Sequence, residues 1–306
     1  MSHLPSVDQL LFYPVKSCGA VSLNTAFVGS RGLVSGQIGD RRWMIVDEDG
    51  VLVSQRGGNG SLAAVKITLL ANCEGVNNRI CASAEGRGSI ILDPEFVTDK
   101  QREVQIHGKK VISHLSAPEI SQWFSDYLNK KVSLVFQKDS DKRWCDQNFA
   151  ADDERDLVSF ADGFSYLVTT RATLDRVNAL ESIAFSMDRF RPNIVIGNTG
   201  IDDEYSWRFI QMGSASLALL KPCDRCEVPT IDQSTGIKTH DQLPLMLAKE
   251  YGLRADFGST RVQGLIFGEN AQASRFGEVS VGDAVHVIES KPIYAFRRKA
   301  APAPGA

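Results

Sequence analysis

The sequence predicts a mainly β fold with a few helices (an α+β protein), and three observations lead to it. Over the first hundred residues, short β-branched runs are separated by turn residues at intervals of about ten. Helical periodicity is clear in only two segments, and no G-x-G-x-x-G opens a helix, which argues against a Rossmann fold. A length of 306 residues, at roughly 150 per domain, favours two domains. We expect a β-rich domain over residues 1–130, a barrel-like domain over 131–296, and a disordered tail or linker over 297–306.

The first domain opens its clear strand pattern with a hairpin. The apolar run Trp43–Val46 is followed by a turn, 47–50, that ends in an Asp-Gly pair, and then by a second apolar run at 51–53. An Asp-Gly pair tolerates the positive φ of a tight hairpin turn. Further strands are expected at 65–70, 88–93 and 104–112, the last one broken at 107–109.

A helix interrupts these strands. Ser116 and Glu119 have the spacing of a capping box, and Pro118 lies in the first turn. Apolar residues then recur with helical spacing and predict a stripe that faces the core: Ile120, Trp123, Phe124, Tyr127 and Leu128. A strand is expected at 132–136. We interpret the polar stretch 138–156 as a long surface loop between the domains, and a lid over a site is the alternative.

The second domain mixes strands with one helix. We expect a helix at 172–180, and a strand, a tight turn and a strand over 278–288. The other expected strands lie at 165–169, 193–196, 216–220 and 264–267. Because there is no regular βαβ alternation, a barrel-like β structure with few helices is the better prediction.

Composition excludes several classes of protein. The formal charge is −3, from 34 Lys plus Arg and 37 Asp plus Glu, so there is no basic excess for a nucleic-acid scaffold. No apolar run reaches the roughly 18 residues that span a bilayer, and the N-terminus lacks the pattern of a signal peptide. Six scattered cysteines are too few for a disulfide scaffold. We therefore expect a cytoplasmic protein without membrane or nucleic-acid partners.

The common catalytic motifs are absent, and one cysteine motif remains. The five histidines are isolated, so we expect each to be an ordinary surface or strand residue, and there is no H-E-x-x-H, G-x-S-x-G or P-loop. Residues 223–226 form a C-x-x-C, which is a redox dithiol, half of a zinc site or two unrelated core thiols. No second pair of metal ligands supports zinc. Arg225 favours a thiolate, which suits a soft metal that brings its own other ligands.

Six segments in one order resemble the MOSC-domain family. The resemblance is to its two-part members, a MOSC N-terminal β domain followed by a MOSC β-barrel domain, related to the mitochondrial amidoxime reducing component and the bacterial YcbX proteins. It covers nearly the whole chain. The segments are LFYPVKSCG (11–19), GDRRW (39–43), FRPNIVI (190–196), CDRCEVPTIDQSTG (223–236), IFGEN (266–270) and VSVGDAV (279–285).

The resemblance implies a molybdenum cofactor, whose pyranopterin carries a dithiolene and a phosphate. In this family the cysteine of the R-C pair is the ligand to molybdenum, which makes Cys226 the implied metal ligand and catalytic residue. The implied cofactor-binding residues are Lys16, Ser17, Arg41, Arg191, Asn193, Asp224, Arg225 and Asn270. Their cations suit an anionic group, Asn193 can donate and accept toward pterin edges, and Asp224 stands where relatives often have a small hydroxyl residue. Because Lys16 and Arg41 precede the first helix and Arg191 follows it, we expect the site in the crevice between the domains.

The resemblance further implies a molybdenum-dependent oxidoreductase that removes oxygen from N-hydroxylated compounds such as amidoximes, hydroxylamines and N-hydroxylated bases. The sequence has no plant-type cluster motif and no flavin or nicotinamide fingerprint. Electrons should therefore come from a separate ferredoxin-like or flavin reductase, or from a redox domain missing from this chain. Two alternatives stay open: a molybdenum cofactor or sulfur carrier that acts in cofactor maturation, and a redox dithiol protein that uses Cys223 and Cys226.

Overall fold

The computed structural model describes residues 4–149, 156–179, 185–239, 254–257, 260–263 and 265–292. Strands dominate this part of the chain and form five sheets, accompanied there by two α-helices, α1 (Pro118–Leu128) and α2 (Arg171–Ala179). The prediction of a mainly β fold with few helices is confirmed. Among the described helices, none has the length and apolar character needed to cross a membrane. The tail predicted at 297–306 lies outside the described residues.

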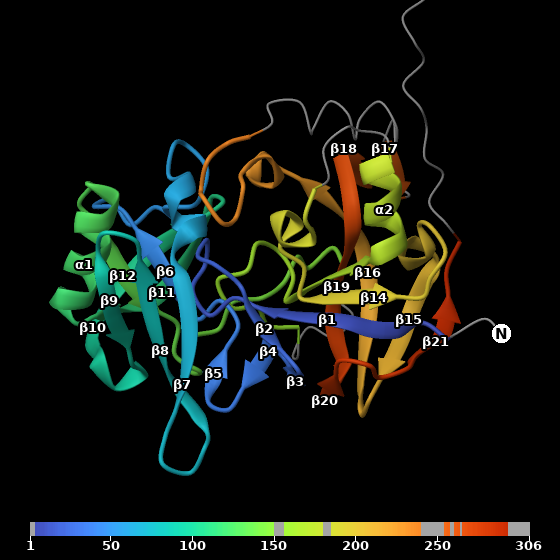
Figure 1. The fold of residues 1–306 in the computed structure, drawn as a ribbon, viewed down its shortest axis with the longest axis horizontal. Helices are drawn as coiled ribbons and strands as arrows, with labels where there is room; N and C mark the ends of the chain where they lie inside the picture. Colours follow the sequence, from blue (N-terminus) through green and yellow to red (C-terminus); the bar gives the residue numbers. More distant parts are fainter. Residues whose placement is uncertain are drawn as a thin grey trace, which may run out of the picture.

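The largest sheet has eight strands and joins the two ends of the chain (Figure 1). Strand β1 pairs antiparallel with β14, so a segment from the N-terminus lies in a sheet built mostly by the second half of the chain. In spatial order the strands are β2 (Val21–Leu23), β1 (Ser6–Phe12), β14 (Ile194–Gly197), β13 (Tyr166–Thr170), β19 (Leu265–Arg275), β16 (Ala215–Arg225), β15 (Trp207–Met212) and β21 (Val285–Ser290).

Two of the smaller sheets, β10-β11-β12-β6 and β7-β8-β9, lie on the left of Figure 1 near α1, whereas β17 and β18 lie on the right beside α2. One has the order β10 (Val97–Ile106), β11 (Lys109–Ser116), β12 (Ser133–Phe136) and β6 (Trp43–Val46). A second sheet is made of β7 (Lys66–Ala71), β8 (Asn77–Ala84) and β9 (Gly88–Leu92). A third has the order β20 (Gly277–Ser280), β3 (Thr25–Gly29), β4 (Gly32–Ser35) and β5 (Ile38–Gly39). The fourth pairs β17 (Arg254–Phe257) with β18 (Thr260–Gln263). The strands expected at 43–46, 65–70, 88–93, 104–112 and 132–136 are confirmed. Strands β10 and β11 turn at residues 107–108, where the break in the pattern was expected.

One βαβ unit occurs in the largest sheet. Strands β13 and β14 are parallel neighbours, and α2 connects them. The sheet is otherwise antiparallel at its described pairings. The expectation of no regular βαβ alternation is confirmed, since a single crossover helix does not make a doubly wound fold.

The predicted capping box at the start of α1 is wrong. The N-cap residue is Ala117, and no side chain caps the helix. Ser116 is the last residue of β11 and pairs with Val97, so its backbone is still in the sheet, and its hydroxyl lies 3.3 Å from that of Ser121. The helix itself is confirmed, since it begins at the predicted proline and buries its apolar stripe against the core.

Two predicted strand pairs take a different form. The turn at 47–50 is present, with Gly50 at φ +80°, but residues 51–53 make only single bridges and backbone bonds to β6 and β10. Leu52 donates its N–H to Gln105 in β10, which draws this segment away from a regular hairpin. The strands predicted over 278–288 are present as β20 and β21, yet they belong to different sheets, because β20 pairs with β3 and β21 with β15.

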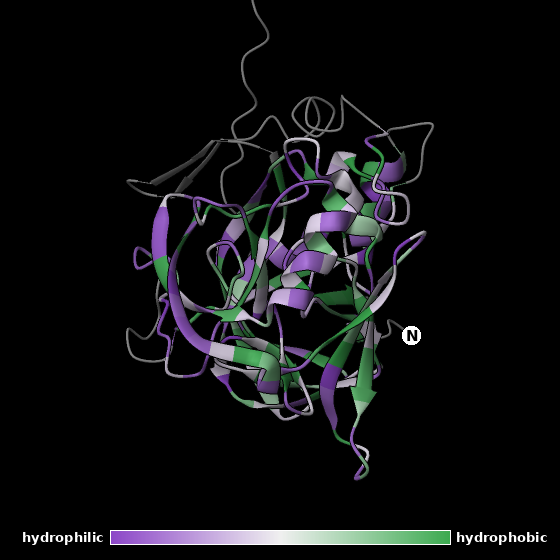
Figure 2. Ribbon diagram, turned by 90° about the vertical axis from the view of Figure 1, so that its left-hand side faces the viewer, coloured by the Kyte–Doolittle hydropathy of each residue, from purple (hydrophilic) through white to green (hydrophobic). Residues whose placement is uncertain are grey.

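A continuous hydrophobic core connects the sheets. It extends from Leu10 in β1 through Trp43 in β6 and Trp123 in α1 to Leu217 in β16. Figure 2 shows green hydrophobic residues along the strands and purple hydrophilic residues on the outer loops. Because strands from both ends of the chain share this core, the loops that follow β1, β5 and β16 meet at one place.

Candidate cofactor pocket

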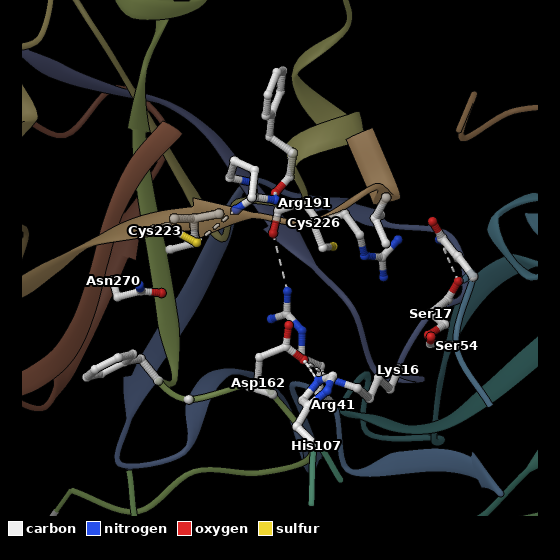
Figure 3. Close-up of a pocket in the computed structure, with 18 of the residues that line it drawn as sticks. Lys16, Ser17, Arg41, Ser54, His107, Asp162, Arg191, Cys223, Cys226 and Asn270 are labelled. Carbon is white, nitrogen blue, oxygen red and sulfur yellow. Dashed lines mark hydrogen bonds and ion pairs between the residues drawn. The ribbon is translucent and has the colours of Figure 1, made fainter. Parts of the chain in front are cut away.

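A pocket of about 130 Å³ lies where these loops meet, with walls from both halves of the chain (Figure 3). Eight of the nine predicted site residues line it: Lys16, Ser17, Arg41, Arg191, Asn193, Arg225, Cys226 and Asn270. Asp224 is absent from the lining, because alternate residues of a strand point to opposite faces and Cys223 and Arg225 point inward. Its carboxylate is half exposed and lies 3.4 Å from the ammonium of Lys221.

Tyr13 holds two of the pocket arginines in place. Its buried ring lies between the guanidinium groups of Arg41 and Arg191, at 4.6 and 4.3 Å from the ring centroid. Such cation–π contacts stabilise a guanidinium out of water. Arg41 also bonds the carboxylate of Asp40 and, at 3.1 Å, Oδ1 of Asn193. Burial raises the pKa of Asp40, and the adjacent Arg41 opposes this. These contacts join the turn after β5 to the start of β14.

Three of the predicted site residues have backbone conformations that residues other than glycine rarely adopt. The φ angles are +73° at Ser17, +51° at Arg41 and +54° at Arg191. Left-handed φ at a residue other than glycine costs on the order of 1–3 kcal/mol and persists only where surrounding contacts impose it, most often at functional sites. The fold thus accepts local strain at these positions to aim two cations and a hydroxyl into one cavity.

Arg191 and Arg225 are partly buried cations whose partners are neutral. Arg191 donates to Oε1 of Gln233 at 3.0 Å and to the carbonyl of Cys18 at 2.8 Å. Arg225 donates to the carbonyl of Phe190 at 2.7 Å and to Sγ of Cys223 at 2.9 Å, while its buried Nε has no partner. Within the described part of the chain, neither forms a salt bridge with a carboxylate. Removing a cation from water without an anion is costly, so these two arginines leave positive charge in the pocket that an anion could neutralise.

Two thiols form the wall opposite the lysine (Figure 3). Cys223 lies near the end of β16, Cys226 directly follows that strand, and both line the pocket. Burial raises the pKa of Cys223, against the influence of Arg225. The register with β19 shifts between Pro222 and Asp224, and bulges of this kind redirect side chains near active sites. Cys18 is also buried, which raises the pKa of its thiol to about 12, and only its carbonyl serves the site, through Arg191.

Sequence reasoning missed Asp162 and His107, which meet at the edge of the pocket. Oδ1 of Asp162 accepts a hydrogen bond from Nζ of Lys16 at 2.5 Å and lies 3.0 Å from Nε2 of His107. Burial by itself would raise the pKa of Asp162, but the ammonium and the imidazole outweigh it and hold the pKa well below the usual range. His107 is a surface residue, as expected, and the β10–β11 turn brings it to the lining of the pocket. No sequence motif marks either residue.

Arg143 anchors the loop that carries Asp162. Its guanidinium donates to three backbone carbonyls, those of Ser159 and Ala161 at 2.7 Å and that of Asp162 at 2.5 Å. The expectation of a surface loop at 138–156 is therefore wrong at Arg143 and at Cys145, which are both buried. The sequence showed only a polar stretch, whereas the structure uses its arginine as a backbone clamp.

Comparison with known proteins identifies the two domains of this chain and its relatives. Residues 4–131 match the MOSC N-terminal beta barrel domain and residues 155–286 match the MOSC domain. The chain is 29% identical to mitochondrial amidoxime-reducing component 1 of Mus musculus over 94% of its length and 84% of that protein. The component 2 protein of Bos taurus is 26% identical with the same coverage. Among solved structures, the YUAD protein of Bacillus subtilis aligns over 92% of this chain and 94% of its own, with 11% identity and a TM-score of 0.36.

The fold and the pocket define a mainly β protein with a pocket lined by cations and thiols where residues from both halves of the chain meet. The chain belongs to the MOSC family, as a member with a MOSC N-terminal β-barrel domain and a MOSC domain.

Proposed function

We propose that this protein is a molybdenum-cofactor-dependent reductase that removes oxygen from N-hydroxylated compounds such as amidoximes, hydroxylamines and N-hydroxylated bases. The observation that carries the proposal is the pair of partly buried arginines, Arg191 and Arg225, which lack a carboxylate partner in the described part of the chain and lie beside the two thiols of the pocket wall. Relatives over most of the chain are named amidoxime-reducing components. A pyranopterin with its phosphate and dithiolene is an anionic group that such a pocket fits.

We assign the residues that would hold the cofactor by their free donors. Lys16, Arg41, Arg191 and Arg225 would bind the anionic groups, and Ser17 and Asn270 would bind polar edges of the pterin. Asn193 takes a different part, because its Oδ1 accepts from Arg41 and its Nδ2 lies 3.4 Å from the carbonyl of Leu11. We propose that it positions Arg41 instead of contacting the pterin.

Cys226 would be the protein ligand to molybdenum. It is half buried, it lines the pocket, and it follows a strand whose register is set by pairing with β19. When bound, the cofactor supplies the two-electron chemistry that cleaves the N–O bond of the substrate. The described residues hold no group of three or more His, Cys, Asp or Glu that could bind a metal ion.

Asp162 would orient the substrate. Its Oδ1 is occupied by Lys16 and His107, and its side chain remains two-thirds exposed at the pocket edge. An ionised carboxylate accepts hydrogen bonds, so its other oxygen would accept the N–H of an amidoxime or hydroxylamine. The overall reaction is R–NH–OH + 2 e⁻ + 2 H⁺ → R–NH₂ + H₂O. We propose that the electrons come from a ferredoxin-like or flavin reductase, as a separate protein or as a domain outside this chain.

One assay tests the proposal. Protein loaded with molybdenum cofactor should not reduce benzamidoxime or N-hydroxylated adenine with a nicotinamide alone, and reduced methyl viologen should start turnover. Molybdenum near one per chain would exclude a simple dithiol protein. Loaded protein that stays inactive with viologen on several N-hydroxylated substrates would contradict the reductase and favour a carrier in cofactor maturation. Activity with the nicotinamide alone would show a second redox centre and overturn the proposed electron supply.

A further inference from the structure

The pocket edge holds a histidine that the proposed reaction has not yet used. His107 lies at the turn between β10 and β11 with φ +47°, and its imidazole is 36% exposed. Its Nε2 lies 3.0 Å from Oδ1 of Asp162, and its Nδ1 lies 3.5 Å from a guanidinium nitrogen of Arg56. The same side chain therefore faces both the solvent and the carboxylate that would contact the substrate.

The backbone of Asp162 is held independently of its side chain. Arg143 clamps the carbonyls of Ala161 and Asp162 from the other side of the loop. What decides the orientation of the carboxylate is thus the pair of donors on Oδ1, Nζ of Lys16 and Nε2 of His107. Both use one oxygen, which leaves the second to face a substrate.

The reaction also needs a source of protons. Reduction of an N-hydroxyl group consumes two protons, and a carboxylate held ionised by Lys16 is a poor source of them. The pKa values of water and hydronium lie far from neutral pH, whereas the ordinary pKa of an imidazole lies close to it. An imidazole is therefore the better proton donor near neutral pH. The charged groups around the imidazole are Asp162, Lys16 and Arg56, and Asp47 and Lys130 line the adjoining groove.

We propose that His107 is the proton relay of the site and the positioning residue for Asp162. Oδ1 of Asp162 orients the imidazolium, and the carboxylate stays ionised throughout. The imidazolium releases its Nε2 proton to the leaving oxygen of the substrate, so the N–H bond of the ring breaks as an O–H bond of the departing water forms. The second proton, which the substrate nitrogen takes up, comes from solvent. The neutral imidazole regains a proton from solvent at its exposed edge. The electrons come from the external donor, and the relay itself involves no redox step.

This inference rests on the proposed function, so the test first requires wild-type turnover with reduced methyl viologen. His107→Gln keeps a donor toward Asp162 but cannot carry a proton. We expect its kcat at pH 8 to fall roughly 10- to 100-fold, with KM nearly unchanged and with partial rescue by added imidazole. The alkaline limb of the pH profile should shift in the variant. His286→Gln, on the exposed β21, is the matched control and should match the wild type.

One further measurement does not depend on turnover. The molybdenum and pterin content of His107→Gln should equal that of the wild type, because the imidazole positions Asp162 and does not hold the cofactor.

The outcomes separate the two proposals. No wild-type turnover with viologen overturns the proposed function. Wild-type turnover together with a His107→Gln variant of unchanged kcat and pH profile overturns the relay alone. A His107→Gln variant that is impaired but not rescued by imidazole, or that loses cofactor, also overturns it and makes His107 a structural residue.

Discussion

Two clusters of ionisable groups border strand β13, one partly buried and one fully buried, and they meet the free-energy cost of taking charge out of water in opposite ways. The pocket beside Tyr166 holds Arg191 and Arg225, whose charges are met by neutral partners. At the other end of the strand, Thr170 and Thr173 donate to Oε2 of the fully buried Glu204. Burial raises the pKa of Glu204 to about 7. A glutamic acid can shed its charge by taking a proton, whereas a guanidinium cannot, so only the arginines require a ligand.

The comparison also distinguishes binding residues from structural ones. The acid cluster can lose its charge within the protein, because Glu204 can take a proton and two threonines donate to its Oε2, while its Oε1 has no hydrogen-bond partner among the described residues. The arginine cluster, strained at Arg191 and supported by the ring of Tyr13, becomes complete only when an anion enters. Buried charge without a partner is thus a better guide to the site here than a perturbed pKa.

The largest expected effect is at the thiol wall. Cys226→Ser should lower reductase activity with viologen by at least about 1,000-fold, because a hydroxyl replaces the thiolate that a soft metal prefers. Cys73→Ser, at an exposed cysteine away from the pocket, is the control and should be nearly silent. Wild-type activity in Cys226→Ser would refute the ligand assignment.

Removing a cation should lower the cofactor content of purified protein. Arg41→Ala deletes the bonds to Asp40 and Asn193 together with the positive charge, and Lys16→Ala deletes the partner of Asp162. We expect pterin and molybdenum per chain to fall several-fold in each variant, measured by fluorescence after oxidation and by metal analysis. Full occupancy in both variants would place the cofactor elsewhere.

The acid cluster should make stability fall as pH rises. The pKa of Glu204 is about 7 in the folded protein, above the ordinary value of 4.5, so the folded state binds the proton more tightly. Its contribution is complete below pH 4.5 and is lost as pH rises through 7, which amounts to about 3 kcal/mol. Urea unfolding of Glu204→Gln should show a flatter pH dependence than the wild type by that amount. Parallel curves would mean that Glu204 is ionised in the fold.

The smallest effect is expected at Asp224. Its carboxylate lies outside the pocket lining, with an exposed ion pair to Lys221, and exposed pairs contribute about 0–1 kcal/mol. Asp224→Asn should therefore keep cofactor content and activity within about twofold of the wild type. A large loss of cofactor would return Asp224 to the binding set that the family resemblance implies.

Much of this protein was determined by the sequence alone. Local patterns predicted the mainly β fold, the helix at 118–128 and most strands, because turn residues and apolar periodicity act over a few neighbouring positions. The six family segments together contain eleven of the residues that line the pocket, eight of which were predicted site residues. These segments can be recognised in the sequence because each one is a short run of consecutive residues in a fixed order.

Other features were decided only by the tertiary structure. Asp162 and His107 lie 55 residues apart and meet because the β10–β11 turn reaches the loop before β13, a contact that no local pattern encodes. Asp224 turns outward because the pleat of β16 directs Cys223 and Arg225 inward. Arg143 is buried because its guanidinium satisfies three carbonyls of a distant loop. In each case the physical reason is the same: hydrogen bonds and charges between segments remote in sequence form only after the sheets have packed.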